Sequence, residues 1–356
     1  MLNKEYAKVV ITRELQDSNH SEVKDHYLKL QNSLENNEFK DLKILIFQPI
    51  AFGDLICSSL SAELLQLKYP GCTIDYLTQI GDFKSVHEAN PFVHEVFVSD
   101  NWELFKTRDT RYEKINGKPS EKGELLKKYD IGYGLYWWNG KEGIVKSFLE
   151  DLELPTDYLR IRLYTQKYKG SIKDIWGDYK GLKICLHQDL PVKWKGDYQK
   201  LKVALEVFGK VKEVGVSTGL QYYESAELLR ESDILVASEG SLSHVAAAVG
   251  TQTVTLSSVY PPEMVMCAYY QNKYQPVNRQ HFVIRPKDFC GDFHCIGHSV
   301  EEYEHKVPPY DFPFRFPPTM MKRCNYKNYK KSCIHEGISV QDIIEVFEKA
   351  LENRKL

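Results

Sequence analysis

Residues 43–71 read KILIFQPIAFGDLICSSLSAELLQLKYPG, and this stretch decides the fold class. A short apolar run ends near Gly53 and Asp54, and apolar residues then recur at near-helical spacing. The pattern predicts a strand over 43–48 followed by a helix near 55–68. A carboxylate therefore stands at a strand-to-helix junction, a place where α/β proteins commonly bind ligands.

The same alternation of strand and helix continues along the chain. Further strands are predicted at 73–78, 95–98, 130–136, 182–187, 211–216, 233–237 and 252–257. A helix between consecutive strands makes those strands parallel. We therefore expect an α/β protein with two Rossmann-like, doubly wound domains that face each other across a cleft. Ligands of such sheets bind at the carboxyl ends of the strands.

Changes in composition divide the chain into parts. They are a helical N-terminal extension (1–40), a first Rossmann-like domain (41–165), a second one (166–335) and a C-terminal helix (336–356). A length of 356 residues suits two domains that each bury a core. The charged segment 100–128 is interpreted as a surface insertion. Its aromatic and basic side chains are candidates for substrate contacts, namely Trp102, Phe105, Arg108 and Arg111.

The composition is that of a soluble globular protein. Hydrophobic residues make up 42% of the chain, charged residues make up 27%, and the formal net charge is -2. This near-neutral charge gives no support for a nucleic-acid partner, which needs clustered Lys and Arg. No apolar run approaches the roughly 18 residues of a membrane span, and the N-terminus lacks the apolar core of a signal peptide. We expect a cytoplasmic protein.

The first strand-to-helix junction carries Gly53 and Asp54. Asp is a favoured helix N-cap, because its side chain accepts the free N–H groups of the first turn. Alternatively, Asp54 takes a proton from an acceptor hydroxyl at the edge of the sheet. Gly53 also has two interpretations: it supplies a positive φ angle, or it lets a substrate approach the backbone closely.

The second junction, 236-VASEGSLSHVAAAVGTQTVTL-256, leads from a strand into a helix of small residues. The N-terminus of such a helix offers N–H groups and a positive dipole end to a diphosphate. Glu239 could accept hydrogen bonds from ribose hydroxyls, and polar side chains could donate to phosphate oxygens. The candidate binding residues are Ser238, Glu239, Gly240, Ser241, Ser243 and His244. The alternative is a helix that a serine simply caps.

Both junctions resemble those of glycosyltransferase family 9, the ADP-heptose:lipopolysaccharide heptosyltransferases. The stretch ILIFQPIAFGDLICSSLSAELLQLKYPGCTIDYLT is similar to the opening of that family, in which a Gly-Asp pair joins the first strand and helix. The stretch SAELLRESDILVASEGSLSHVAAAVGTQTVTL is similar to its donor motif, a strand followed by Asp-Ser-Gly-x-x-His and an Ala-rich helix. Here Glu239-Gly240-Ser241 stands in place of Asp-Ser-Gly.

The resemblance implies a GT-B fold with the acceptor on the N-terminal side and the nucleotide-sugar on the C-terminal side. It implies an inverting transfer that requires no metal, with Asp54 as the general base, a saccharide acceptor and ADP-heptose as the expected donor. The stretch from His187 to Leu190 departs from the family's His-Pro-Gly-Ala. Lys193 and Lys195 could stabilise the leaving diphosphate, the alternative being that they are solvated surface lysines.

Eight cysteines are too few for a disulfide scaffold in a chain of this length. Those in apolar segments are interpreted as core residues: Cys57, Cys72, Cys185 and Cys267. The others lie in the Cys/His/Pro-rich segment 284–333: Cys290, Cys295, Cys324 and Cys333. These four could hold a structural zinc or iron, or they could remain reduced thiols. Some protein heptosyltransferases related to the resembled family bind iron through cysteines.

Two other functions fit the same architecture. A nucleotide-sugar 2-epimerase is one, although its donor loop resembles Gly-Gly-x-Gln-Glu-Glu, whereas Gly240 is followed here by Ser-Leu-Ser-His. The second is a nucleotide-binding module without catalysis, which the altered donor motif would permit. The sequence favours the transferase, since both junctions then have a chemical role.

Overall fold

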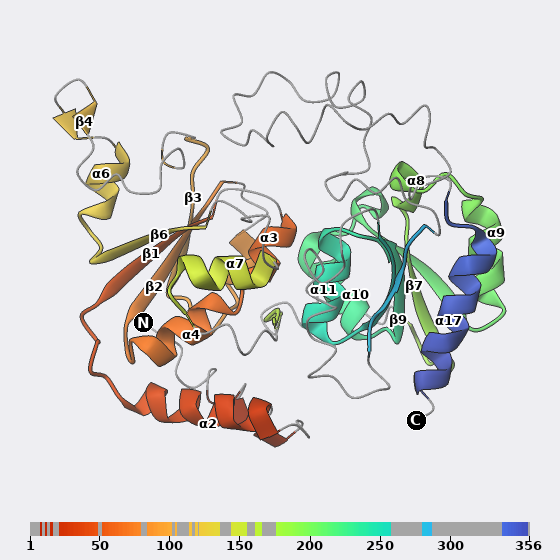
Figure 1. Ribbon diagram of the computed structural model, residues 1–356, viewed down its shortest axis with the longest axis horizontal. Helices are drawn as coiled ribbons and strands as arrows, with labels where there is room; N and C mark the ends of the chain where they lie inside the picture. The colour runs from red at the N-terminus through yellow and green to blue at the C-terminus, as the bar shows by residue number, and fades with distance from the viewer. Residues whose placement is uncertain are drawn as a thin grey trace. The chain divides into compact units, whose positions relative to one another are not determined.

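The computed structural model divides into two compact units, Met1–Lys169 and Gly170–Leu356. The residues that the structure describes are 8, 11–12, 15–16, 21–48, 52–79, 84–101, 104, 114–115, 118–119, 121–135, 144–154, 161–165, 176–257, 280–286 and 337–354. Each unit contains a parallel sheet with helices packed on it (Figure 1). The α/β class predicted from the sequence is therefore confirmed.

The sheet of the first unit has the strand order β3-β2-β1-β6, with every pair parallel. The strands are β1 (Lys43–Gln48), β2 (Thr73–Thr78), β3 (Glu95–Val98) and β6 (Ile131–Gly134). The order changes direction at β1, because β2 and β3 follow on one side of it and β6 lies on the other. Parallel sheets bind ligands at such a reversal, beyond the carboxyl ends of the strands. Asp54 lies in α3 (Phe52–Cys57), the first helix after β1.

The helix predicted near 55–68 is two helices in the structure, α3 (Phe52–Cys57) and α4 (Ser61–Lys68). The turn between them is stabilised by the main-chain N–H of Ser61, which donates to the carbonyl of Ser58 at 2.9 Å. The remaining helices of this unit are α2 (Ser21–Glu35), α5 (Lys84–His87), α6 (Glu121–Leu126) and α7 (Ile144–Asp151).

Helix α2 packs against α4 through a buried carboxylate. Glu63 of α4 is fully buried, and it accepts hydrogen bonds from the hydroxyls of Tyr27 on α2, at 3.2 Å, and of Tyr164. His26 of α2 lies 3.4 Å from the same carboxylate. A buried carboxylate must be compensated in this way. The N-terminal helix is thus joined to the first unit by specific polar contacts.

The sheet of the second unit has the order β11-β10-β9-β7-β8, again with every pair parallel. Its strands are β7 (Lys183–His187), β8 (Lys210–Val214), β9 (Ile234–Ser238), β10 (Gln252–Leu256) and β11 (Phe282–Ile284). Numbered within the unit, the order is 2-1-3-4-5, that of the flavodoxin-like sheet. Its reversal point lies between β7 and β9.

Helices cover both faces of this second sheet (Figure 1). They are α8 (Leu190–Lys193), α9 (Tyr198–Glu206), α10 (Tyr222–Arg230), α11 (Ser241–Val249) and α17 (Val340–Arg354). On one face, Trp194 and Phe347 are fully buried among aliphatic side chains of the strands. The C-terminal helix α17 is held by Arg354, which donates to the carbonyl and the carboxylate of Asp233 at 2.8 and 2.6 Å.

The structure also contains elements that the sequence pattern did not predict. Within the supposed insertion 100–128, a short antiparallel pair, β4 (Lys114–Ile115) and β5 (Lys118–Pro119), precedes α6. Strand β11 has only three residues and was also missed. In the part of the chain described, no helix has the length and apolar character needed to cross a membrane.

Candidate functional site

The junction after β1 is organised by a buried glutamine. Gln48, the last residue of β1, is fully buried, and its Nε2 donates to the main-chain carbonyl of Asp54 at 2.9 Å. Its Oε1 accepts a hydrogen bond from the hydroxyl of Ser58. The main-chain N–H of Ser58 also donates to the carbonyl of Asp54, at 3.0 Å. The side chain at the end of the strand thus fixes the helical turn that carries Asp54.

Asp54 does not have the position of an N-cap. Helix α3 begins at Phe52, so Asp54 is its third residue and lies in the first turn. The capping interpretation is therefore wrong, since an N-cap residue precedes the helix. A carboxylate in the first turn still interacts favourably with the helix dipole. Asp54 and Gly53 are both partly exposed, and φ of Gly53 is not positive. Of the two interpretations of Gly53, only close approach of a ligand remains.

The junction after β9 is a glycine turn. Gly240 has φ +144° and ψ −167°, a conformation that essentially only glycine adopts. Before it, the main-chain N–H of Glu239 donates to the carbonyl of Leu256 at 2.8 Å. The carboxylate of Glu239 accepts from the hydroxyl of Ser257 at 2.9 Å. Glu239 is thus held across the ends of β9 and β10, while it remains partly exposed.

The first turn of α11 has no side-chain cap, because its N-cap position is occupied by Gly240. The alternative of a serine cap is therefore wrong. Ser241 is exposed, whereas Ser243 is fully buried and donates its hydroxyl to the carbonyl of Gly240 at 2.7 Å. His244 is 8% exposed. Ser243 hence stabilises the turn, and the main-chain N–H groups of Ser243 and His244 donate to the same carbonyl at 3.2 and 3.4 Å, while no side chain caps the helix.

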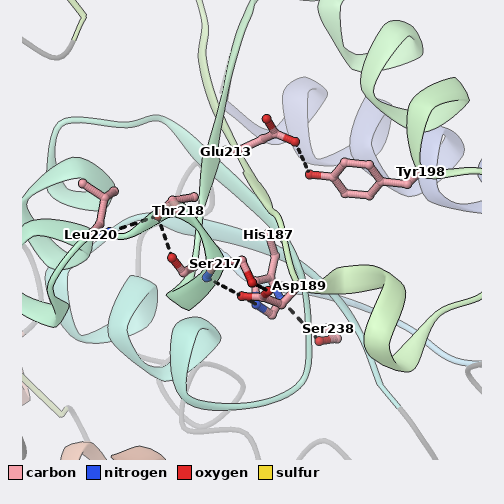
Figure 2. A network of polar contacts seen from close by, with 9 residues as sticks. His187, Asp189, Tyr198, Glu213, Ser217, Thr218, Leu220 and Ser238 are labelled. Atoms are coloured by element: carbon pink, nitrogen blue, oxygen red, sulfur yellow. Dashed lines mark hydrogen bonds and ion pairs between the residues drawn. The ribbon is translucent and has the colours of Figure 1, made fainter.

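A polar network that the sequence did not predict connects the ends of three strands (Figure 2). His187, at the end of β7, lies with its Nδ1 3.4 Å from the hydroxyl of Ser238, at the end of β9. Its Nε2 is 3.8 Å from the carboxylate of Asp189. That carboxylate accepts from the hydroxyl and, at 3.4 Å, from the main-chain N–H of Ser217, in the turn after β8. The network therefore spans the reversal point between β7 and β9.

Gly215 allows the β8 turn to approach this network. It has φ +140°, and a Cβ atom placed on it would lie 2.7 Å from the Asp189 carboxylate and 3.0 Å from the His187 ring. No other residue type fits there without displacing one of these side chains. The short 3-10 helix η4 (Val216–Thr218) follows, and Val216 at its start is 89% exposed. The turn presents an apolar side chain at the same edge.

A second ion-paired group lies on β8. Tyr198 donates its hydroxyl to Glu213 at 2.9 Å, and Lys202 approaches the same carboxylate at 3.1 Å. Burial and the hydrogen bond to Glu213 raise the pKa of Tyr198. The phenol stays protonated and acts as a donor that fixes α9 on the sheet.

The predicted lysines lie at α8. Lys193 is the last residue of this helix, and Lys195 is exposed and donates to the carbonyl of Pro191 at 3.1 Å. The predicted metal ligands Cys290, Cys295, Cys324 and Cys333 are outside the described residues, as is Cys267. Among the residues described, no group of three or more His, Cys, Asp or Glu could hold a metal ion. Cys57, Cys72 and Cys185 are buried and form no disulfide, as expected for core residues.

The two junctions can perform complementary chemistry. The start of α11 offers main-chain N–H groups and a positive dipole end, which suit a phosphate group. Glu239 and Asp189 are hydrogen-bond acceptors, which suit hydroxyls of a ribose or a sugar. Asp54 is a partly exposed carboxylate on a fixed helical turn and can accept a proton.

Comparison with solved structures establishes the class of fold. The chain has the GT-B fold of glycosyltransferase family 9, so the expected fold and the resemblance are confirmed at this level. No family model matches the sequence, and no curated protein sequence matches it.

Three of the similar structures are informative. The glycosyl transferase family 9 structure from Veillonella parvula has 14% identity and TM-score 0.56, covering 88% of this chain and 98% of that chain. The E. coli ADP-heptose lps heptosyltransferase II has 14% identity and TM-score 0.53, covering 88% and 100%. The iron-containing heptosyltransferase TibC from enterotoxigenic E. coli, in complex with ADP-D-β-D-heptose, has 14% identity and TM-score 0.55, covering 88% and 76%.

Proposed function

We propose that this protein is an inverting glycosyltransferase that moves a sugar from a nucleotide-diphosphate donor to a saccharide acceptor without a catalytic metal. The observation that carries the proposal is the turn at Gly240. It opens the N-terminus of α11 without a side-chain cap, at the carboxyl end of a parallel sheet. In a GT-B fold, such a turn is suited to hold the diphosphate of a donor.

The donor would contact the second unit. The N–H groups of the first turn of α11, with His244 of that turn, would stabilise the charge that develops on the departing diphosphate. Glu239, fixed by Ser257, would accept hydrogen bonds from ribose hydroxyls. Lys193 and Lys195 would contribute positive charge. Fixed donors of this kind can replace the divalent ion that other transferases use.

The acceptor would be activated in the first unit. A hydroxyl that attacks an anomeric carbon must lose its proton, and Asp54 would take it as general base. A positioned carboxylate contributes about 10² to 10⁴ in rate. The hydrogen bonds of Gln48 and Ser58 to the carbonyl of Asp54 support this role, since they fix the turn on which the carboxylate stands.

The expected donor is ADP-heptose. Two proteins that share the fold use or bind this donor: the ADP-heptose lps heptosyltransferase II, and TibC in its complex with ADP-D-β-D-heptose. A lipopolysaccharide saccharide is the corresponding acceptor class, and a cytoplasmic location fits a nucleotide-sugar substrate.

A thermal-shift screen with ADP, GDP and UDP, each alone and as a nucleotide-sugar, tests the proposal. We expect ADP and ADP-heptose to raise the melting temperature, and EDTA to leave the shift unchanged. The Asp54→Asn variant should show the same shift, because Asp54 would act on the acceptor. If none of the nucleotides shifts the melting temperature, the donor site is wrong. Conversion of the donor without an acceptor would indicate an epimerase instead.

A further inference from the structure

A group of buried polar side chains in the first unit has no role in the proposed reaction. They are Ser59, Ser61, Tyr76, Thr78 and His87, called here the Tyr76 cluster. All five are at most 2% exposed. In the part of the chain that the structure describes, the hydroxyls of the first four and both ring nitrogens of His87 have no hydrogen-bond partner.

The members of the Tyr76 cluster lie on one face of the sheet. Tyr76 and Thr78 are two residues apart on β2, so their side chains point the same way. Thr78 is paired in register with Gln48, whose side chain contacts Ser58 in the turn between α3 and α4. The face of the cluster is therefore the face that this turn covers.

Other contacts bring the remaining members to the same place. The ring of His87 stacks on that of Tyr76, with centroids 3.9 Å apart and an interplanar angle of 21°. The hydroxyl of Tyr76 faces that of Ser61 without the geometry of a normal hydrogen bond. The carbonyl of Ser59 accepts from the side chain of Asn90 at 3.3 Å, which ties the turn to the segment after α5.

Six buried polar atoms for which the described residues supply no partner would lower the stability of a domain considerably. Each one lowers the folding equilibrium constant by roughly tenfold or more if nothing compensates it. Folded domains have a small margin of stability, so a group of this size must find partners. Since the described residues supply no partner, we look for the partners among molecules enclosed in the fold.

The chemistry of the Tyr76 cluster selects a neutral partner. Four hydroxyls can each donate and accept, and a neutral imidazole has one donor and one acceptor. Burial lowers the pKa of His87 from 6.5 to about 3, so the ring is neutral at physiological pH. No described member is charged, which disfavours an ion. Enclosed polar groups of this kind are typically bridged by water.

We propose that the Tyr76 cluster is a binding site for ordered water molecules that connect β2 to the turn between α3 and α4. Each water would bridge two or more of the six atoms. Because this turn directly follows α3, the waters would form part of the support beneath the helix that carries Asp54. The inference does not depend on the reaction proposed for the protein.

A high-resolution crystal structure of the full chain tests the site directly. We expect solvent density within hydrogen-bond distance of at least two side chains of the Tyr76 cluster. A map in which protein atoms alone surround these groups would overturn the proposal.

A matched pair of substitutions tests the energetics. Thr251 is a buried threonine whose hydroxyl donates to the carbonyl of Leu229, so Thr251→Val should lower the urea midpoint of unfolding. If an enclosed water molecule forms a hydrogen bond with the hydroxyl of Thr78, then Thr78→Val should lower the urea midpoint of unfolding to a similar extent. If the hydroxyl of Thr78 has no partner, its removal relieves a penalty and raises the midpoint, which contradicts the proposal.

Discussion

Gln48 Nε2 donates a hydrogen bond of 2.9 Å to the main-chain carbonyl of Asp54, across the junction between β1 and α3. The glutamine is fully buried and its Oε1 accepts from Ser58, so both ends of the amide are used. The strand end thus holds the main chain of the helix through the carbonyl of Asp54 and not through its carboxylate. Gln48 is therefore a positioning residue for the proposed base.

The Gln48→Met substitution should reduce turnover by more than its loss of stability explains. It removes both hydrogen bonds at similar side-chain volume, and we expect a loss of about 1–3 kcal/mol in the free energy of unfolding. We also expect kcat to fall by about tenfold with KM for the donor unchanged. Gln66 offers a matched control, since its Nε2 donates to the carbonyl of Cys72 at 2.8 Å within the same unit. Gln66→Met should destabilise comparably and leave kcat unchanged; equal effects of both on kcat would refute the positioning role.

Two glycines at opposite ends of α11 separate nucleotide binding from stability. Gly240 has φ +144° and Gly250 has φ +87°, and a Cβ atom added to either would have no neighbour within 4 Å. Alanine at either site therefore costs about 1–3 kcal/mol of backbone strain without a clash. Gly240→Ala should abolish the thermal shift given by ADP, because it moves the first turn of α11. Gly250→Ala should retain the shift from a lower starting temperature, and loss of the shift in both variants would show a global effect.

Asp189 should matter for nucleotide affinity through the turn after β8. Asp189→Ala removes the acceptor for Ser217 and frees that turn, so we expect ADP affinity measured by calorimetry to fall about tenfold, or ~1.4 kcal/mol. Asp197 is the comparison, since it caps α9 by accepting from the N–H of Lys200 at 2.9 Å. Asp197→Ala should cost about 0.5–2 kcal/mol of stability and leave ADP affinity intact. Unchanged affinity in Asp189→Ala would exclude the turn from the site.

The buried imidazole of His87 should make the first unit less stable in acid. Burial lowers its pKa from 6.5 to about 3. Between these values the unfolded chain binds a proton that the folded chain does not, so the free energy of unfolding falls as pH falls. The contribution is at most about 1.4 kcal/mol per pH unit.

Urea titrations at several pH values check this slope. His87→Phe keeps a ring against Tyr76 and removes the titrating group, so its stability should depend less steeply on pH between about 4 and 6. Burial also lowers the pKa of His281 in the second unit, to about 4. Because His281 is present in both proteins, its contribution to the pH dependence is the same in each. Identical slopes in the two proteins would show that His87 is accessible to protons in the folded state.

Much of the fold could be predicted from periodicity. Strands β1, β2 and β3 have the predicted bounds, because each is a clear apolar run with turn signals at its ends. The break between α3 and α4 was missed, since apolar spacing continues across 58–60 and only the hydrogen bonds of Ser58 reveal the turn. Strand β11 is too short to produce an alternation.

The candidate site was only partly predictable. Glu239 and Gly240 were predicted because glycine at a strand-to-helix junction is an informative local signal, and they remain predictions. The contact of His187 with Ser238 could not be found, because it joins residues 51 positions apart and depends on the strand order. Gln48 was missed because a polar residue at a strand end is expected to face solvent. Its complete burial is a property of the tertiary structure.

The central claim is tested most directly by the release of ADP from ADP-heptose in the presence of a saccharide acceptor, followed for the wild type and for Asp54→Asn. Asn has almost the same shape as Asp but cannot take a proton, so the variant should bind ADP with unchanged affinity and release it at least about 10²-fold more slowly. Equal rates in the two proteins, or no release and no ADP binding in the wild type, would contradict the account.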